Sequence, residues 1–215
     1  MRKALDIMVL LFVLTTLAFG LIGCDGNVDQ AKPEESEDVP QEPTSLDVFV
    51  IEGTTLKELT DYGETLGSIV LPDTITTLGE YAFENCTNLI SIKIPSSITE
   101  IGKGAFQGCS GLINITIPDN VTKIGNWTFA DCTSLTSVTI PDSVTVIGRE
   151  AFYRCESLTS ITIPSSVTEI GYEAFWGCSN LTDIYVNQSE STLLDNADVP
   201  DECTIHWNST ESGSV

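Results

Sequence analysis

The apolar positions of residues 72–186 recur with a period of 23 residues over five units. In the unit segment 135–141, Val138 and Ile140 alternate with polar residues, as in a half-buried strand. The proline that follows, Pro141 in this unit, cannot donate the next ladder hydrogen bond, so it predicts the end of the strand. Each unit therefore contributes one short strand to the predicted structure.

The second half of each unit predicts a return path on the opposite side. Val144 and Ile147 form a second apolar pair before Gly148, which we expect to adopt a backbone φ that other residues resist. Ala151, Phe152 and Cys155 then have a spacing that suits one face of a single helical turn. Stacked units bury the apolar side chains that one unit alone leaves exposed. The expected fold class is an α/β solenoid with parallel strands on one face and short helical turns on the other.

Six residue types, proline and leucine among them, repeat in unbroken register through all five units. The glycines are Gly79, Gly102, Gly125, Gly148 and Gly171, and the phenylalanines are Phe83, Phe106, Phe129, Phe152 and Phe175. The cysteines are Cys86, Cys109, Cys132, Cys155 and Cys178, and the threonines are Thr76, Thr99, Thr122, Thr145 and Thr168. Equivalent residues of stacked units face one another. We expect the phenylalanines to form the core and the threonines to hydrogen-bond along the solenoid.

The units resemble the BspA-type leucine-rich repeats, whose pattern is approximately L-x-x-I-x-I-P-x-x-V-x-x-I-G-x-x-A-F-x-x-C. Thr128 replaces the alanine of this pattern once. Residues 48–71 fit a degenerate N-terminal capping repeat, and residues 187–207 resemble the truncated closing unit of the family, a C-terminal cap. We expect residues 208–215 to form a disordered tail. The resemblance implies a surface adhesin or a host-interaction protein, as in some relatives.

The N-terminus has the pattern of a secretory signal. Arg2 and Lys3 precede the uncharged apolar run 7–22. Residues 21–24, Leu-Ile-Gly-Cys, resemble the lipobox of bacterial lipoproteins, which implies cleavage after a signal peptide of residues 1–23 and a lipid on Cys24. An ordinary signal peptide or an uncleaved anchor is the alternative. Residues 24–47 are acidic and interrupted by prolines, so they predict a disordered tether.

The charge of the chain excludes several classes of function. Nine Lys and Arg against 31 Asp and Glu give a net charge of −22, which opposes binding to nucleic acid. The one histidine, His206, lies near the C-terminus and is more consistent with a cap than with catalysis. Cysteines 23 residues apart do not make a zinc site. We therefore expect neither an enzyme nor a bound cofactor or metal.

The periodic cysteines allow two interpretations. Secretion permits disulfides, but side chains of stacked units project in parallel at about 4.8 Å, wider than the roughly 3.8 Å that a bridge prefers between Cβ atoms. Buried thiols packed under the next unit are therefore favoured. Cys203 is slightly out of register, 25 residues after Cys178, and is either free or paired.

Candidate binding residues lie where the repeat varies. The exposed positions of the strands form a polar surface about 25 Å long, at the spacing of neighbouring strands. On the other side, aromatic residues flank the Ala-Phe pair, where they either bind a ligand or cover gaps between turns. The candidates are Lys93, Asn114 and Tyr185 on the strands and Tyr81, Trp127, Tyr153, Tyr172 and Trp176 on the turns.

These observations predict a lipid-anchored, extracytoplasmic lipoprotein of the cell envelope that is displayed at the cell surface. We expect it to act as a binding module for a protein or glycan, in adhesion or in recognition of a host or partner protein. The alternative is a scaffold or assembly partner within the envelope. The membrane contact is made through the N-terminal lipid.

Overall fold

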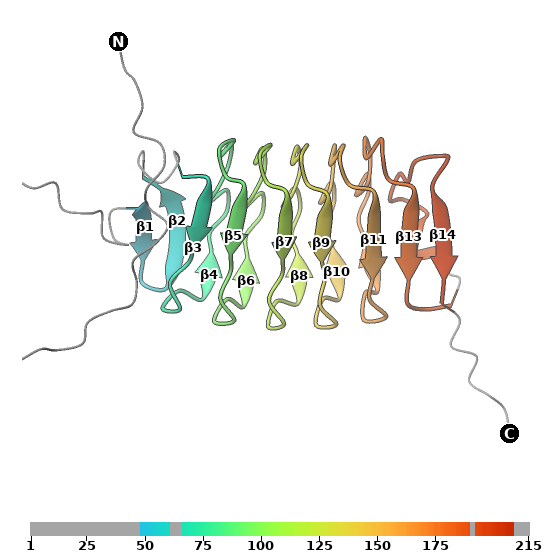
Figure 1. Ribbon diagram of the computed structural model, residues 1–215. Helices are drawn as coiled ribbons and strands as arrows, with labels where there is room; N and C mark the ends of the chain where they lie inside the picture. Colours follow the sequence, from blue (N-terminus) through green and yellow to red (C-terminus); the bar gives the residue numbers. More distant parts are fainter. Residues whose placement is uncertain (1–47, 61–65, 190–191, 209–215) are drawn as a thin grey trace, which may run out of the picture. The chain divides into compact units, whose positions relative to one another are not determined.

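The computed structural model describes residues 48–60, 66–189 and 192–208. The predicted signal peptide, Cys24, the acidic tether and residues 209–215 of the predicted tail lie outside these residues. The described part is a parallel β-solenoid of about six turns with a repeat of about 23 residues (Figure 1). Among its residues, no helix has the length and hydrophobicity needed to span a membrane.

The first sheet carries the strands that the sequence pattern predicts. Its hydrogen-bonded orders are β3-β5-β7-β9 and β11-β13-β14, and β9 lies beside β11 (Figure 1). The strands are β3 (Ser68–Val70), β5 (Ser91–Lys93), β7 (Asn114–Thr116), β9 (Ser137–Thr139), β11 (Ser160–Ile163), β13 (Asp183–Val186) and β14 (Thr204–Trp207). Parallel pairing joins residues 23 apart, such as Asn114 with Ser137. The last pairing, Asp183 with Thr204, shortens this offset to 21 residues.

Other strands form the second side of each coil, in the orders β1-β2-β4-β6 and β8-β10-β12, and from β4 onward each of them has two residues. They are β1 (Phe49–Glu52), β2 (Thr55–Leu59), β4 (Thr77–Leu78), β6 (Glu100–Ile101), β8 (Lys123–Ile124), β10 (Val146–Ile147) and β12 (Glu169–Ile170). The antiparallel hairpin β1–β2 lies at the N-terminal end of the stack (Figure 1). At the other end, the 3-10 helix η2 (Thr192–Leu194) contacts β12.

The prediction of short helical turns on the return path of each unit is wrong. Five equivalent residues, among them Tyr81 and Glu150, have φ between 53° and 61°, which a right-handed helix does not permit. The backbone hydrogen bonds also alternate in direction. The N–H of Phe83 donates to the next coil at Ala105 O (2.8 Å), whereas that of Glu84 donates back to Tyr81 O (2.9 Å). These segments are therefore successive turns that form a ladder with the neighbouring coil.

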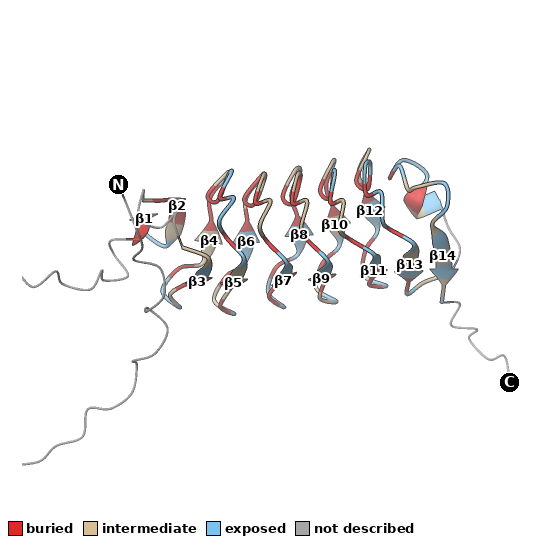
Figure 2. Cartoon of the chain, turned by 45° about the horizontal axis from the view of Figure 1, so that its top comes forward, coloured by how far each residue is buried: buried red, intermediate tan, exposed pale blue. Residues whose placement is uncertain are grey.

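The core runs through the interior of the coils (Figure 2). Five fully buried phenylalanines stack with ring centroids 5.1–5.6 Å apart and planes within 15° of parallel. Such pairs add about 0.5–1.5 kcal/mol each beyond the area they bury. Thr128, at the one exception to the alanine pattern, is buried and donates from Oγ1 to Gly125 O at 2.9 Å. The predicted phenylalanine core is confirmed.

The structure confirms the hydrogen-bonded threonine ladder. Thr76 Oγ1 donates to Thr54 Oγ1 at 2.9 Å, and Thr145 Oγ1 donates to Thr122 O at 3.2 Å. The backbone N–H of Thr145 donates to the same carbonyl at 2.9 Å. The ladder thus ties successive coils together outside the core.

The cysteines of the repeat are buried thiols, as favoured from the sequence, and four of them hydrogen-bond to the preceding coil. Cys109, Cys132, Cys155 and Cys178 are buried and free, and each Sγ donates to the carbonyl oxygen of a phenylalanine 26 residues earlier, at 3.0–3.2 Å. Burial is the main cause that raises the pKa of Cys178 to about 12. Cys203 immediately precedes β14, and Thr182 occupies the equivalent position immediately before β13. Cys203 is therefore not part of the cysteine series.

Candidate functional site

The exposed face of the first sheet carries two rows of side chains. Because side chains alternate across a strand, the residues at the first and third strand positions point away from the core. One row is Ser68, Ser91, Asn114, Ser137, Ser160, Asp183 and Thr204, and the other is Val70, Lys93, Thr116, Thr139, Thr162, Tyr185 and His206. The predicted residues Lys93, Asn114 and Tyr185 are all exposed on this face.

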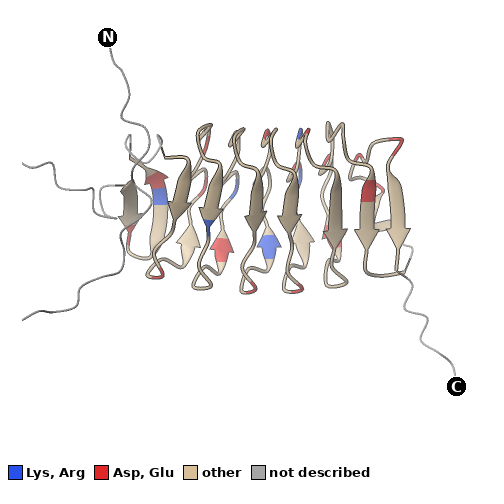
Figure 3. Cartoon of the chain, viewed as in Figure 1, with Lys and Arg blue, Asp and Glu red and all other residues tan. Residues whose placement is uncertain are grey.

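This strand face bears few charges. Lys93 on β5 and Asp183 on β13 stand among mostly uncharged residues (Figure 3). The acidic residues are concentrated elsewhere, for example in the loop that precedes β14, where Asp201 and Glu202 are exposed. The strand face is consequently a hydroxyl-rich surface on a regular backbone.

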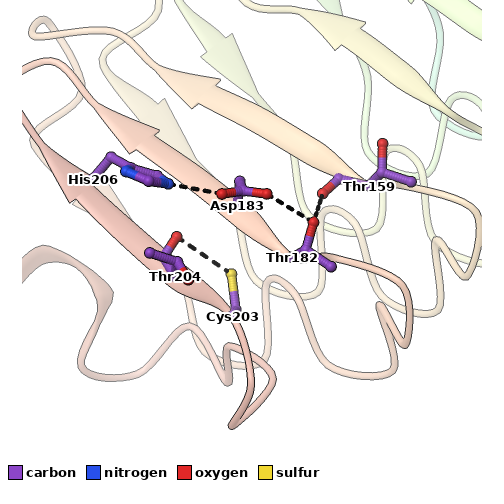
Figure 4. Close-up of polar contacts among 6 residues, drawn as sticks. All are labelled: Thr159, Thr182, Asp183, Cys203, Thr204 and His206. Carbon is purple, nitrogen blue, oxygen red and sulfur yellow. Dashed lines mark hydrogen bonds and ion pairs between the residues drawn. The ribbon is translucent and has the colours of Figure 1, made fainter.

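The C-terminal end of the strand face contains a cluster of four interacting side chains, of which Thr182, Asp183 and His206 are drawn in Figure 4. The rings of Tyr185 and His206 stack with centroids 4.5 Å apart and an interplanar angle of 11°. His206 Nε2 lies 2.7 Å from Asp183 Oδ1, and Thr182 Oγ1 lies 2.8 Å from the other carboxylate oxygen. The hydrogen bond with His206 is the largest cause that holds the pKa of Asp183 below its usual value, and the hydrogen bond from Thr182 acts in the same direction.

Sequence reasoning did not place His206 in this row. It lies 21 residues after Tyr185, so a search at a period of 23 does not align the two. The alternation of β14, with Ile205 aligned to Ile184, is the pattern that could have identified it. His206 is therefore part of the candidate surface as well as of the terminal strand.

The aromatic residues of the turns interact mainly with other side chains of the chain. Lys103 Nζ lies 4.5 Å from the ring centroid of Trp127 and 5.6 Å from that of Tyr81. A Cβ at Gly104 would lie 2.4 Å from Tyr81 Cε1, so the Tyr81 ring covers the backbone of this glycine. Tyr81 and Trp127 are half-buried. For Tyr81 and Trp127, these contacts favour the interpretation that the aromatic residues cover gaps between turns.

The units 141–163 and 164–186 leave more aromatic surface exposed. Trp176 stacks on Tyr153 with centroids 4.8 Å apart and is 43% exposed. Tyr172 is 54% exposed, and the guanidinium of Arg149 lies 5.7 Å from its ring centroid. The nearby Glu173 is the main cause that raises the pKa of the Tyr172 hydroxyl. Trp176 and Tyr172 are the turn residues that retain surface for a ligand.

The structure does not bring the two predicted groups together. Lys93, Asn114 and Tyr185 project from the first sheet, whereas the aromatic residues follow the short strands of the second side. A pocket of about 280 Å³ lies on that second side, where it is lined by charged residues of both signs. The charged lining residues are Glu80, Glu100, Lys103 and Lys123. In the part of the chain that the structure describes, no cluster of His, Cys, Asp and Glu could hold a metal ion.

Comparison with known proteins identifies the repeat. A family model described as the BspA type leucine rich repeat region matches residues 54–197 in six copies. The solved leucine-rich repeat protein of T. pallidum, TpLRR, is 28% identical, with a TM-score of 0.66 over 78% of this chain and 82% of that chain. A leucine-rich repeat protein from Bacteroides ovatus is 35% identical, with a TM-score of 0.58 over 67% of this chain.

The chain spans 41% of the Bacteroides ovatus protein, so that relative is considerably longer than the shared region. No curated protein gives a significant match. The family model covers most of the solenoid, from residue 54 to residue 197.

Proposed function

Since this chain belongs to the BspA-type leucine-rich repeat family, we propose that it is a non-catalytic protein-binding module held at the bacterial cell surface by a lipid on Cys24. Repeats of this family typically serve as binding modules, and its members are commonly exposed at bacterial surfaces. The apolar run before Cys24 and the lipobox-like residues 21–24 support export and lipidation. The acidic segment after Cys24 would hold the solenoid away from the membrane.

The observation that carries the proposal is the strand face. Its parallel strands give a regular backbone, while the exposed side chains change from Lys93 through three threonines to Tyr185. A fixed surface loses little conformational entropy on binding, and an exposed aromatic residue supplies a large contact area. A row that changes from coil to coil suits an irregular partner, such as a folded protein, better than a repetitive polymer. We therefore assign adhesion or partner recognition to this face.

The proposal is tested on intact cells that express the full chain. External protease should remove the repeat epitope, and Cys24→Ser should reduce the amount retained by the cells. The cells are then assayed for retention on immobilised host proteins, envelope proteins and glycans. Protection of the epitope from protease would contradict surface display.

Paired variants identify the binding face. Tyr185→Ala combined with Lys93→Glu should lower retention at least tenfold, because both change the strand face. Trp176→Ala, an exposed aromatic residue on the turn side, is the matched control and should leave retention within twofold. Retention that depends on Trp176 alone would overturn the assignment of the face. The absence of any retained partner, together with loss of envelope integrity on deletion, would replace the binding function by a scaffold function.

A further inference from the structure

The last strand of the first sheet has an open edge. β14 pairs with β13 on one side, and no described strand lies on its other side. The N–H groups of Thr204 and Asn208 donate to β13, at Thr182 O and Val186 O, both at 2.8 Å. Backbone groups alternate in direction along a strand of a parallel sheet. Ile205 and Trp207 therefore direct their N–H and C=O groups away from β13, which makes this edge a template for a further strand.

The inward side chains of β14 are also incompletely covered. Ile161, Ile163, Ile184 and Val186, the inward residues of β11 and β13, are 0–2% exposed, because a coil lies on each side of them. Ile205 and Trp207 pack against the same core but remain half-buried. The terminal strand thus leaves hydrogen-bonding groups and apolar surface uncovered along the same edge.

We propose that a second copy of the chain pairs with β14 in antiparallel orientation across a two-fold axis, so that one sheet continues through a homodimer. One register uses all the open groups of Ile205 and Trp207. In it, Ile205 faces Trp207 of the second copy in a hydrogen-bonded pair, and the reciprocal pair is identical by symmetry. The axis then passes between the two His206 residues.

The side chains of β14 favour this occupant. Ile205 and Trp207 point inward, so the register places an apolar residue opposite an apolar residue on the core side of the joined sheet. The two His206 rings lie opposite each other on the exposed face and extend the Tyr185–His206 stack. β14 itself carries no carboxylate, lysine or arginine, so a second copy brings no like charge into the strand pair apart from His206, which is held near Asp183.

The surrounding charge gives the dimer a definite salt dependence. Asp201 and Glu202 precede β14 and are exposed, so each copy brings carboxylates close to the interface. Screening weakens repulsion between exposed like charges. We therefore expect the dimer fraction to increase between 50 and 500 mM salt, because the Debye length falls from about 14 Å to about 4 Å over this range.

Cysteine cross-linking tests the register directly. In an antiparallel non-hydrogen-bonded pair the Cα atoms are about 4.5 Å apart, within the range of a disulfide. His206→Cys is introduced into the full chain carrying Cys24→Ser and Cys203→Ser, purified in detergent, and treated with a mild oxidant. We expect at least a fivefold larger covalent dimer band on a non-reducing gel than for Thr162→Cys, an exposed residue of the same row two strands away. Equal bands for the two variants would overturn the proposal.

A variant of the open edge supplies the second measurement. Ile205→Lys should shift the sedimentation of the full chain from dimer to monomer, whereas Thr162→Lys should not, and circular dichroism shows whether each variant is folded. A wild-type chain that is monomeric at tens of micromolar, with no cross-link at position 206, contradicts the proposal. It also fails if cross-linking appears only after deletion of residues 209–215, since the chain's own tail would then occupy the edge.

Discussion

Gly148 lies against the backbone of the coil before it. A Cβ at this position would lie 2.7 Å from the nitrogen of Asn126 and 2.7 Å from the carbonyl carbon of Gly125. Gly171 and Gly102 meet equivalent backbone atoms at 2.4–2.7 Å. The left-handed conformation occurs at other residues, such as Gly104 and Trp127, so the expected unusual φ at Gly148 is wrong. Close approach between coils therefore accounts for the glycine at positions 102, 148 and 171, whereas a Cβ at Gly125 would meet no atom nearer than 3.3 Å.

Gly148→Ala should therefore destabilise the protein by about 1–3 kcal/mol, the usual range for a residue forced into a packed site. Gly67→Ala is the matched control, because its Cβ would lie 3.4 Å from the flexible end of Ile90, an ordinary contact. Replacing such a glycine is neutral or stabilises by up to about 1 kcal/mol. Urea unfolding followed by circular dichroism measures both. Equal effects of the two substitutions would contradict the close-approach explanation.

The turn segments show how an element depends on its neighbours. Alternate N–H groups of each segment donate to the next coil, so these hydrogen bonds form only when the coils are stacked. The spacing of Ala151, Phe152 and Cys155 fits one face of a helix, and it also fits a chain of turns that points the same side chains inward. Their inward placement could therefore be predicted from the sequence. Their backbone conformation could not, because it is decided by hydrogen bonds to residues about 22 positions away.

The phenylalanine stack gives a prediction for these elements. Phe129 is fully buried between Phe106 and Phe152, with centroids at 5.6 and 5.4 Å. Phe129→Ala should lower the free energy of unfolding by about 3–5 kcal/mol, through lost burial and a cavity. Phe129→Leu should cost less, since it retains most of the volume and loses mainly the stacking.

The same urea titration measures these losses. The exposed Trp176→Ala serves as control and should change the stability by less than about 1 kcal/mol, in the range of surface substitutions. An effect of Phe129→Ala no larger than that of the control would mean that the stack does not hold the coils together.

At the scale of the whole molecule, the solenoid is a chain of neighbouring contacts. Each coil pairs with the one before and the one after, and the parallel register between them is constant from β3 to β13. Stability in such a protein is close to a sum of unit and interface contributions. A whole unit can then be removed without loss of register.

Deletion of residues 118–140, one full period, should leave a folded protein with a lower free energy of unfolding and a smaller m-value, because less surface is buried. Deletion of residues 118–128 should prevent normal folding, since it places strand residues against turns. Circular dichroism and urea unfolding distinguish the two. A folded 118–128 deletion, or an unfolded 118–140 deletion, would show that the coils are not interchangeable units.

The sequence by itself determined the period, the parallel strands, the buried phenylalanine and cysteine series, and the strand residues that face solvent. These features follow from the alternation of apolar and polar residues within one unit and from the repetition of the units, and both patterns can be read in the sequence. Only the tertiary structure decided the left-handed turns, the reason for the glycines, and the contacts of Lys103 with two aromatic rings. It also placed His206 beside Tyr185, because the last coil is two residues shorter. The turns, the glycines and the Lys103 contacts depend on how closely the stacked coils approach each other, which no single unit specifies.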